Sequence, residues 1–115
     1  NANPSSMAAA LRSFAARPTA AGQRKLVVLG DMFELGDDSA VEHHQLGQLL
    51  AELPLPQVLL IGPEMTGAAE VANHFQHFTT KAEAAEWLRT HPVRDRQVLV
   101  KGSRGMALET LVELL

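Results

Sequence analysis

The chain has 115 residues, of which 46% are hydrophobic and 20% are charged, and its net charge at pH 7 is −3. It is too apolar for a disordered protein, and its length suits one domain around a single core. The acidic balance argues against binding to nucleic acid, and the absence of cysteine excludes disulfide bonds and thiolate chemistry. Because no run approaches the ~18 apolar residues of a membrane span, we expect no membrane insertion and a cytoplasmic location.

The first predicted element is a helix that begins at Asn3-Pro4. Asparagine is a good N-cap, and proline is tolerated at the first helical position because its missing N–H would be unpaired there. The apolar residues then follow helical spacing, at Met7, Ala10, Leu11 and Phe14. The stretch 17–22 ends this helix with a proline and a glycine.

Three apolar runs, each followed by glycine, predict strands at 25–29, 57–61 and 98–101, and a weaker run predicts a short strand at 75–78. The strong runs do not alternate with polar residues, which is typical of strands buried on both faces of a parallel sheet. Ligands bind beyond the carboxyl ends of such strands. The residues at these ends and just beyond them are therefore the first candidates for a site: Asp31, Glu34, Glu64, Lys101, Ser103 and Arg104.

Two capping boxes predict the starts of two further helices. They are Ser39-x-x-Glu42 and Thr80-x-x-Glu83, in which the first and last side chains would each bond a backbone N–H of the other. The expected buried residues are Leu46, Leu49, Leu50 and Leu53 in the first helix, and Ala84, Trp87 and Leu88 in the second.

Two other helical patterns complete the chain. One spans 65–72 and is weakened by Gly67. The other begins near Ser103, and its expected buried residues are Leu108, Leu111, Val112 and Leu115. Helices thus alternate with strands, which predicts an α/β protein: a single domain with a doubly wound, mainly parallel, Rossmann-like sheet in a three-layer αβα arrangement.

The sharpest local motif is Lys101-Gly-Ser-Arg-Gly105. A strand ends here, the glycines let the backbone approach a ligand closely, and the predicted helix would offer free N–H groups. The charges of Lys101 and Arg104 suit a carboxylate or a phosphate. A glycine turn with two solvated cations explains these residues equally well, and the spacing of a nucleotide P-loop is absent.

A second candidate is the loop Gly30-Asp-Met-Phe-Glu-Leu-Gly36. The carboxylates of Asp31 and Glu34 could hold a ribose hydroxyl, an ammonium group or Mg²⁺, although a merely solvated loop is the commoner case. Histidine offers no comparable metal site, because His43 and His44 are adjacent and point to different faces of their helix. Neither cysteine nor an H-E-x-x-H motif supports them.

Four of these motifs together resemble the C-terminal domain of the Mur ligases. They are Asn1-Ala-Asn-Pro-Ser-Ser-Met7, Val28-Leu-Gly-Asp-Met-x-Glu-Leu-Gly36, His43-x-x-x-Gly47 and Leu99-Val-Lys-Gly-Ser-Arg104. The resemblance spans the whole chain and is nearest to the family members that join D-alanyl-D-alanine to UDP-N-acetylmuramoyl-tripeptide in bacterial peptidoglycan synthesis. It implies that residues 1–115 are one domain of a three-domain enzyme, without its N-terminal and central ATPase domains.

The resemblance also implies the chemistry. ATP and Mg²⁺, bound mainly by the absent central domain, convert the tripeptide carboxylate to an acyl phosphate, which the dipeptide amine attacks. The C-terminal domain closes over the ATPase domain and contacts nucleotide and dipeptide, which would exclude water. In the family an acidic residue and a tyrosine precede the Asn-Ala-Asn-Pro motif, and this chain starts after both. We therefore expect the piece to fold, to hold no cofactor alone and to be catalytically inactive.

The same resemblance assigns roles to individual residues. Asn1 and Asn3 match the motif near the nucleotide and are assigned to nucleotide binding. Substrate binding is assigned to Asp31, Glu34, Lys101, Ser103 and Arg104, the last three near the dipeptide carboxylate or the closed interface. His43 would brace the 31–36 loop through a hydrogen bond or serve only the core. The resemblance assigns no catalytic residue and no metal ligand to this fragment.

Three other interpretations stay open. A free-standing flavodoxin-like module for a small molecule would need a complete ligand loop, and none is evident in the chain. A protein-interaction domain would need an exposed apolar patch on the outer helices. The C-terminal domain of a related ligase, such as folylpolyglutamate synthase, is disfavoured by the Gly-Asp-Met-x-Glu-Leu-Gly and Lys-Gly-Ser-Arg pair.

Overall fold

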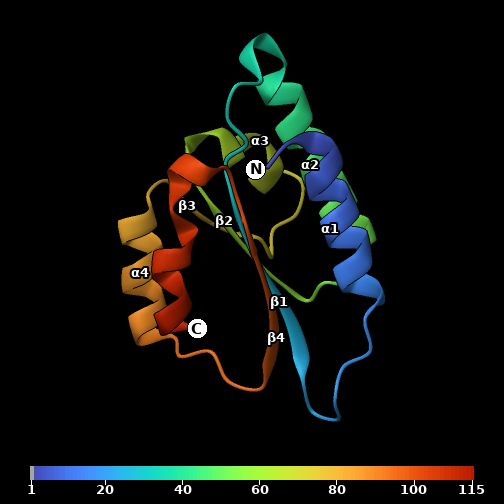
Figure 1. Ribbon diagram of the computed structural model, residues 1–115, viewed down its shortest axis with the longest axis vertical. Coiled ribbons are helices and arrows are strands. Elements are labelled where there is room, and N and C mark those ends of the chain that lie inside the picture. The colour runs from blue at the N-terminus through green and yellow to red at the C-terminus, as the bar shows by residue number, and fades with distance from the viewer. Residues whose placement is uncertain (1) are drawn as a thin grey trace.

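The structure, a computed structural model, describes residues 2–115 and has a four-stranded sheet in the order β3-β2-β1-β4 (Figure 1). Every pair of neighbouring strands is parallel. The strands are β1 (Arg24–Gly30), β2 (Gln57–Ile61), β3 (Gln76–Phe78) and β4 (Arg96–Lys101). Because β2 and β3 lie on one side of β1 and β4 lies on the other, the chain reverses direction across the sheet. This confirms the doubly wound parallel arrangement.

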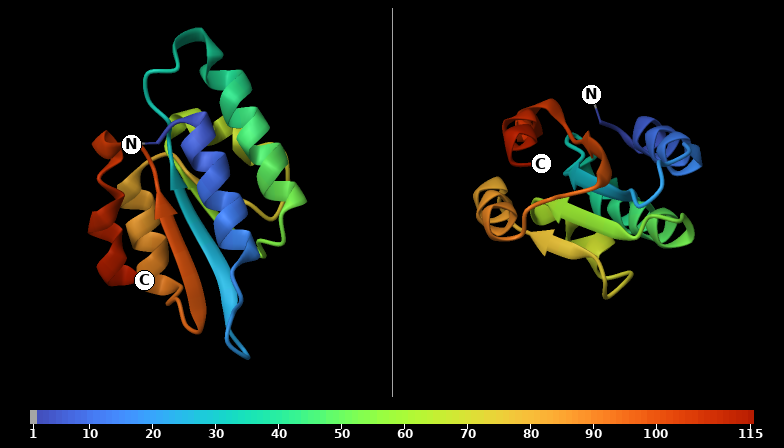
Figure 2. Two further views of the ribbon diagram at one scale, coloured as in Figure 1. Left: turned by 45° about the vertical axis from the view of Figure 1, so that its right-hand side comes forward. Right: turned by 90° about the horizontal axis from the view of Figure 1, so that it is seen from below.

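Helices cover both faces of the sheet and make it the middle of three layers (Figures 1 and 2). Alternate side chains of β1 and β2 point to opposite faces. Val27, Leu29, Val58 and Leu60 join the core under α1 and α2, whereas Leu26, Val28, Leu59 and Ile61 join the core under α4 and the C-terminal segment. These side chains have no exposed surface, as the unbroken apolar runs predict.

Helix α1 (Pro4–Ala16) begins as predicted, with Asn3 as its N-cap. The Ser6 N–H donates to Asn3 Oδ1 at 2.9 Å, and the Asn3 N–H donates to Ser6 Oγ at 3.0 Å. Its buried residues, Met7, Leu11 and Phe14, pack on the sheet, while Ala10 is half-buried. None of the helices within residues 2–115 is long and apolar enough to cross a membrane.

Helix α2 (Ser39–Glu52) starts differently from the prediction. A 3₁₀ turn at Gly36–Asp38 runs directly into it, so Ser39 already has helical dihedral angles, φ −55° and ψ −48°. The capping box predicted at Ser39 is therefore wrong, because a capping residue needs an extended backbone. Three of the four predicted apolar residues are buried, Leu46, Leu49 and Leu50, and Leu53 is half-buried.

Helix α3 (Thr66–Ala69), preceded by a 3₁₀ turn at Pro63–Met65, is shorter than the predicted helix. It lies close against α2. A Cβ atom on Gly47 would come within 2.6 Å of the Ala68 carbonyl oxygen, so this contact requires a residue without a side chain.

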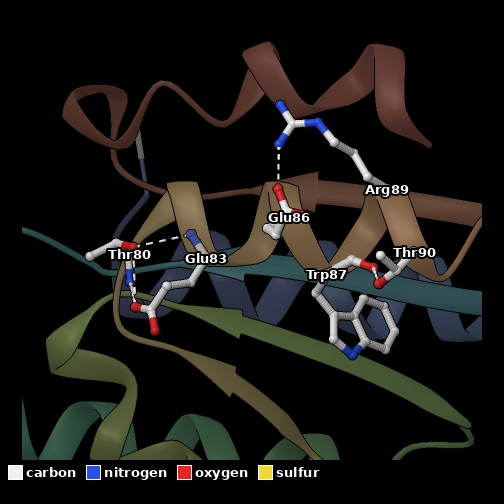
Figure 3. Close-up of polar contacts among 6 residues, drawn as sticks. All are labelled: Thr80, Glu83, Glu86, Trp87, Arg89 and Thr90. Atoms are coloured by element: carbon white, nitrogen blue, oxygen red, sulfur yellow. Dashed lines mark hydrogen bonds and ion pairs between the residues drawn. The ribbon is translucent and has the colours of Figure 1, made fainter.

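Helix α4 (Lys81–Thr90) has the predicted capping box between Thr80 and Glu83 (Figure 3). The Glu83 N–H donates to Thr80 Oγ1 at 3.2 Å, and the Thr80 N–H donates to Glu83 Oε1 at 3.0 Å. Ala84 and Leu88 are buried as expected, and Trp87 is half-buried. The exposed ion pair between Glu86 and Arg89 lies on the outer face of this helix (Figure 3).

The predicted C-terminal α-helix is wrong. The segment instead forms two 3₁₀ stretches, Arg104–Met106 and Leu108–Leu114, separated by Ala107 in the left-handed conformation. In a 3₁₀ helix every third side chain shares a face, which places Leu108 and Leu111 together in the core. Val112 falls off that face and is 54% exposed, contrary to the prediction, and Leu115 is half-buried.

Candidate functional site

The predicted site residues after β1 and β4 lie side by side, because these strands are neighbours and parallel. The Ser103 N–H donates to the Asp31 carbonyl oxygen at 3.1 Å and joins the two loops directly. The chain's start reaches the same place, since Ser103 Oγ lies 3.5 Å from the Ala2 carbonyl oxygen. The carboxyl edge of the sheet therefore collects the segments that the sequence singled out. Asn1, predicted to contact nucleotide, lies outside the described residues.

Asp31, predicted as a substrate ligand, is only 2% exposed. Its Oδ1 accepts the Met65 N–H at 3.0 Å and its Oδ2 accepts the Glu64 N–H at 3.2 Å. Gly62, in a conformation that favours glycine (φ 119°), makes room for this carboxylate, since a Cβ there would approach it to 2.3 Å. Both oxygens of Asp31 therefore already join the loop after β1 to the loop after β2.

Burial raises the pKa of Asp31 above its ordinary value of 3.8. The N–H donors of Glu64 and Met65 oppose this effect, while the Glu64 carboxylate reinforces it. Desolvation is the largest of these effects, so the net direction is upward.

His43, on α2, has no exposed surface and braces the same loop. Its Nδ1 lies 2.8 Å from the Ser39 carbonyl oxygen, to which it must donate, and its Nε2 accepts the Met32 N–H at 3.1 Å. The hydrogen bond that the sequence offered as one explanation of this residue is thus present. Ser39 Oγ also donates to Glu64 Oε1 at 2.7 Å and continues the contacts to the next loop.

Ser103, also predicted as a substrate ligand, is only 4% exposed. Its Oγ accepts the Phe33 N–H at 2.8 Å. Asp31, His43 and Ser103 are the buried polar residues within the described part of the chain, and all three bond this junction. Local sequence patterns missed this property, since Phe33 and Ser103 are 70 positions apart.

Glu34 and Phe33 face outward from the braced loop. The Glu34 side chain is exposed, and its backbone is left-handed with φ 63°. Phe33 is 43% exposed and lies beside Gly105, where a Cβ would come within 2.6 Å of the ring. Sequence patterns gave Phe33 no role. The loop carries no local signal that marks it, because Met32 and Leu35 are apolar as well.

Lys101 and Arg104 form the cationic part of the edge. They line a cavity of about 340 Å³ together with Gly102, Leu108 and Glu109. Lys101 is half-buried and Arg104 is exposed, and neither side chain bonds another residue within 2–115. The expected helix N-terminus is absent from this position, because only a 3₁₀ turn follows Ser103. Any anion here would therefore be held by the two side chains and loop N–H groups.

Asn3, predicted to contact nucleotide, is exposed at the start of α1. Its Oδ1 serves as the cap acceptor for the Ser6 N–H. Nucleotide binding by Asn3 stays a prediction.

The described residues do not fit a magnesium site. No group of three or more histidine or carboxylate side chains in residues 2–115 is arranged to hold a metal ion. In Asp31, both carboxylate oxygens already accept hydrogen bonds from backbone N–H groups.

Comparison with known proteins places the chain in a family. A protein-family model described as "Mur ligase, glutamate ligase domain" matches residues 1–104. The UDP-N-acetylmuramoyl-tripeptide–D-alanyl-D-alanine ligase of Escherichia coli is 36% identical over 118 residues, which cover 100% of this chain and 25% of that protein. A crystal structure of MurF from Acinetobacter baumannii matches with 41% identity and a TM-score of 0.83, covering 98% of this chain and 25% of that one.

A third relative adds a bound nucleotide. MurF ligase from Thermotoga maritima, in complex with ADP, is 26% identical with a TM-score of 0.76, covering 99% of this chain and 26% of that one. The chain thus spans about a quarter of the length of these relatives. Since the family match covers most of its residues, the chain belongs to the family of the Mur ligase, glutamate ligase domain.

Proposed function

We propose that this chain is the C-terminal domain of an ATP-dependent ligase that joins D-alanyl-D-alanine to UDP-N-acetylmuramoyl-tripeptide, in the cytoplasm of a bacterium. The observation that carries the proposal is the similarity to such ligases from end to end of the chain. The two cations Lys101 and Arg104, which line one cavity at the carboxyl edge, support it. We call the longer protein that would carry this chain the parent ligase.

The proposed reaction has two steps. ATP transfers its γ-phosphoryl group to the tripeptide carboxylate, which releases ADP and forms an acyl phosphate. The dipeptide amine attacks the acyl carbon, phosphate leaves with the electron pair of the broken C–O bond, and the amine loses a proton as the amide forms. Phosphoryl chemistry, ATP and Mg²⁺ belong mainly to the rest of the parent ligase, because this chain offers no metal site within its described residues.

This domain would bind and orient the acceptor. Lys101 and Arg104 are proposed to hold the dipeptide carboxylate, since two free cations beside loop N–H groups suit such an anion. Glu34 faces outward and is proposed to contact substrate or the partner domain. Asp31 and Ser103 would serve the site by fixing its backbone, and Asn1 and Asn3 are proposed to approach the nucleotide when the domains close. Closure would keep water from the acyl phosphate.

An amide NMR titration of the chain with Mg-ATP, and separately with D-alanyl-D-alanine, tests the proposal. We expect shifts confined to residues 2–7, 30–36 and 101–105, with a Kd of about 1 mM or weaker, because the other domains contribute most of the site. Binding near 1 µM, or ligase turnover by the chain alone, would instead favour a self-sufficient module. The parent ligase should release phosphate only when the dipeptide is present.

A further inference from the structure

Three successive backbone N–H groups in the loop after β1 donate to partners on three different elements. The Asp31 N–H donates to the Ile61 carbonyl oxygen at 3.2 Å, at the end of β2. The Met32 N–H donates to His43 Nε2 on α2, and the Phe33 N–H donates to Ser103 Oγ after β4. The direction in which the loop leaves the sheet therefore depends on two side chains as well as on the sheet itself.

Of these two side chains, His43 has the more demanding chemistry. A carbonyl oxygen faces its Nδ1 and an N–H faces its Nε2, so the ring must be neutral with its proton on Nδ1. Ser39 Oγ, which donates to Glu64, also lies 3.2 Å from Nδ1. If Nε2 carried a proton, its N–H would face the Met32 N–H, and the hydrogen bond that holds the Met32 backbone would be lost.

The residues that follow Met32 are the ones displayed at the edge. Phe33 lies against Gly105, in the loop that carries Arg104, and Glu34 faces outward with a left-handed backbone. A change in direction at Met32 would move the Phe33 ring and the Glu34 carboxylate relative to the two cations. Holding Met32 therefore aligns one loop of the edge with the other.

We propose that His43 is a positioning residue for the dipeptide: by accepting the Met32 N–H it presets Phe33 and Glu34 beside the cationic loop that takes the dipeptide carboxylate. This inference rests on the proposed function. His43 itself touches no substrate, because it has no exposed surface. Its effect should appear in the binding of D-alanyl-D-alanine and not in the transfer of phosphate from ATP.

The first test uses the unaltered chain and does not depend on any activity. Nitrogen NMR of the imidazole should show His43 as the neutral Nδ1–H form, with Nε2 coupled through its hydrogen bond to the Met32 amide. A proton on Nε2 would overturn the inference. In His43→Gln, whose side-chain oxygen still offers an acceptor, the Met32 and Phe33 amide signals should stay closer to those of the unaltered chain than in His43→Phe.

The second test uses the parent ligase. In His43→Phe the KM for D-alanyl-D-alanine should rise about tenfold while the KM for ATP changes less than about twofold, and His43→Gln should recover part of the loss. His44→Gln is the matched control, since His44 is exposed on the same helix and its Nδ1 lies 3.2 Å from the Gly67 carbonyl oxygen, away from Met32.

The outcomes are separable. An inactive unaltered parent ligase would count against the proposed function and leave the NMR result as the test of the hydrogen bond. An active ligase in which folded His43→Phe keeps its KM for dipeptide would overturn the positioning role. Equal losses in every kinetic constant would also overturn it, because they indicate general damage to the fold.

Discussion

The two loops at the carboxyl edge of the sheet are built in opposite ways. In the loop after β1, the backbone N–H groups of residues 31–33 and both carboxylate oxygens of Asp31 have protein partners. At the end of β4 and in the loop after it, Lys101 and Arg104 line a cavity, and their side chains bond no other residue within 2–115. One loop is a fixed support, and the other presents unpaired charge.

This difference shows where a ligand would gain its binding energy. Groups already bonded within the fold have little left to offer a substrate, whereas unpaired cations gain new hydrogen bonds when an anion arrives. A rigid neighbouring loop also lowers the entropy that binding must remove. Substitutions of the bonded groups in the loop after β1 should therefore lower stability, and substitutions of the two cations should lower only ligand binding.

The largest effect on stability is expected from Gly62→Ala. Its φ of 119° is unfavourable for alanine, and the added Cβ would lie 2.3 Å from the Asp31 carboxylate. Backbone strain and overpacking together should lower the free energy of unfolding by about 3 kcal/mol or more, measured by urea denaturation. Gly36→Ala is the control, because its φ is also positive, at 58°, but no atom lies within 4 Å of the new Cβ. A loss of only about 1 kcal/mol in both variants would mean that the Asp31 carboxylate moves freely, which contradicts a fixed support.

Asp31→Ala should have the next largest effect. It leaves the N–H groups of Glu64 and Met65 without acceptors, which should cost about 1–3 kcal/mol in unfolding free energy. The exposed Glu34→Ala in the same loop should change stability by less than about 0.5 kcal/mol. If Glu34→Ala lowers the unfolding free energy more than Asp31→Ala does, the assignment of Asp31 to the fold and of Glu34 to the exposed surface of the loop is wrong.

The Asp31 variant should also change the pH dependence of stability. Burial raises the pKa of Asp31 in the folded chain above 3.8, so the folded state holds this proton more tightly than the unfolded state does. The stabilisation from this group is full below pH 3.8 and is lost as the pH rises through the raised pKa. The difference in unfolding free energy between the unaltered chain and Asp31→Ala should therefore narrow as the pH increases through that window. A difference that widens instead would mean that the folded-state pKa is lowered.

Local sequence patterns predicted the strands and their parallel arrangement well, because unbroken apolar runs and strand-end glycines are short-range signals. They failed where the preceding residues decide the backbone. Thr80 follows β3 with an extended backbone and caps its helix, whereas Ser39 follows a 3₁₀ turn and is already helical. The two tetrapeptide patterns are equivalent, so spacing alone could not separate them.

Local sequence patterns could not predict the buried contacts of the site, for a different reason. Phe33 with Ser103 and Asp31 with Met65 are brought together by the sheet and lie far apart in the sequence. Sequence patterns single out Asp31 and Ser103 but do not distinguish a ligand-binding side chain from one that bonds the neighbouring loop. The resemblance to the Mur ligases has the same limit, since a shared motif does not say what each side chain contacts.

Ser103→Ala is expected to lower stability less than Asp31→Ala does. It tests whether Ser103, in the loop after β4, supports the fold or takes part in dipeptide binding. Removing Oγ leaves the Phe33 N–H without an acceptor, which should lower the unfolding free energy by about 1 kcal/mol in thermal denaturation. Ser13→Ala, on the exposed face of α1, is the control and should be neutral or slightly stabilising. If Ser103→Ala leaves stability intact but weakens dipeptide binding in the parent ligase, Ser103 binds the dipeptide together with Lys101 and Arg104.

The smallest effect on stability, and the largest on binding, is expected for the two cations. Arg104→Ala and Lys101→Met, which keeps an apolar stem, should each change the unfolding free energy by less than about 0.5 kcal/mol. In the parent ligase each should raise the KM for D-alanyl-D-alanine about tenfold to a hundredfold, because a hydrogen bond to a charged group contributes about 1.5–3 kcal/mol. Arg94→Ala is the control, since Arg94 is an exposed cation that precedes β4 at the opposite end of the strand. If Arg104→Ala and Arg94→Ala had equal effects, general electrostatic attraction would explain the cationic edge. Unfolding of either cation variant would show that the loop after β4 supports the fold as the other loop does.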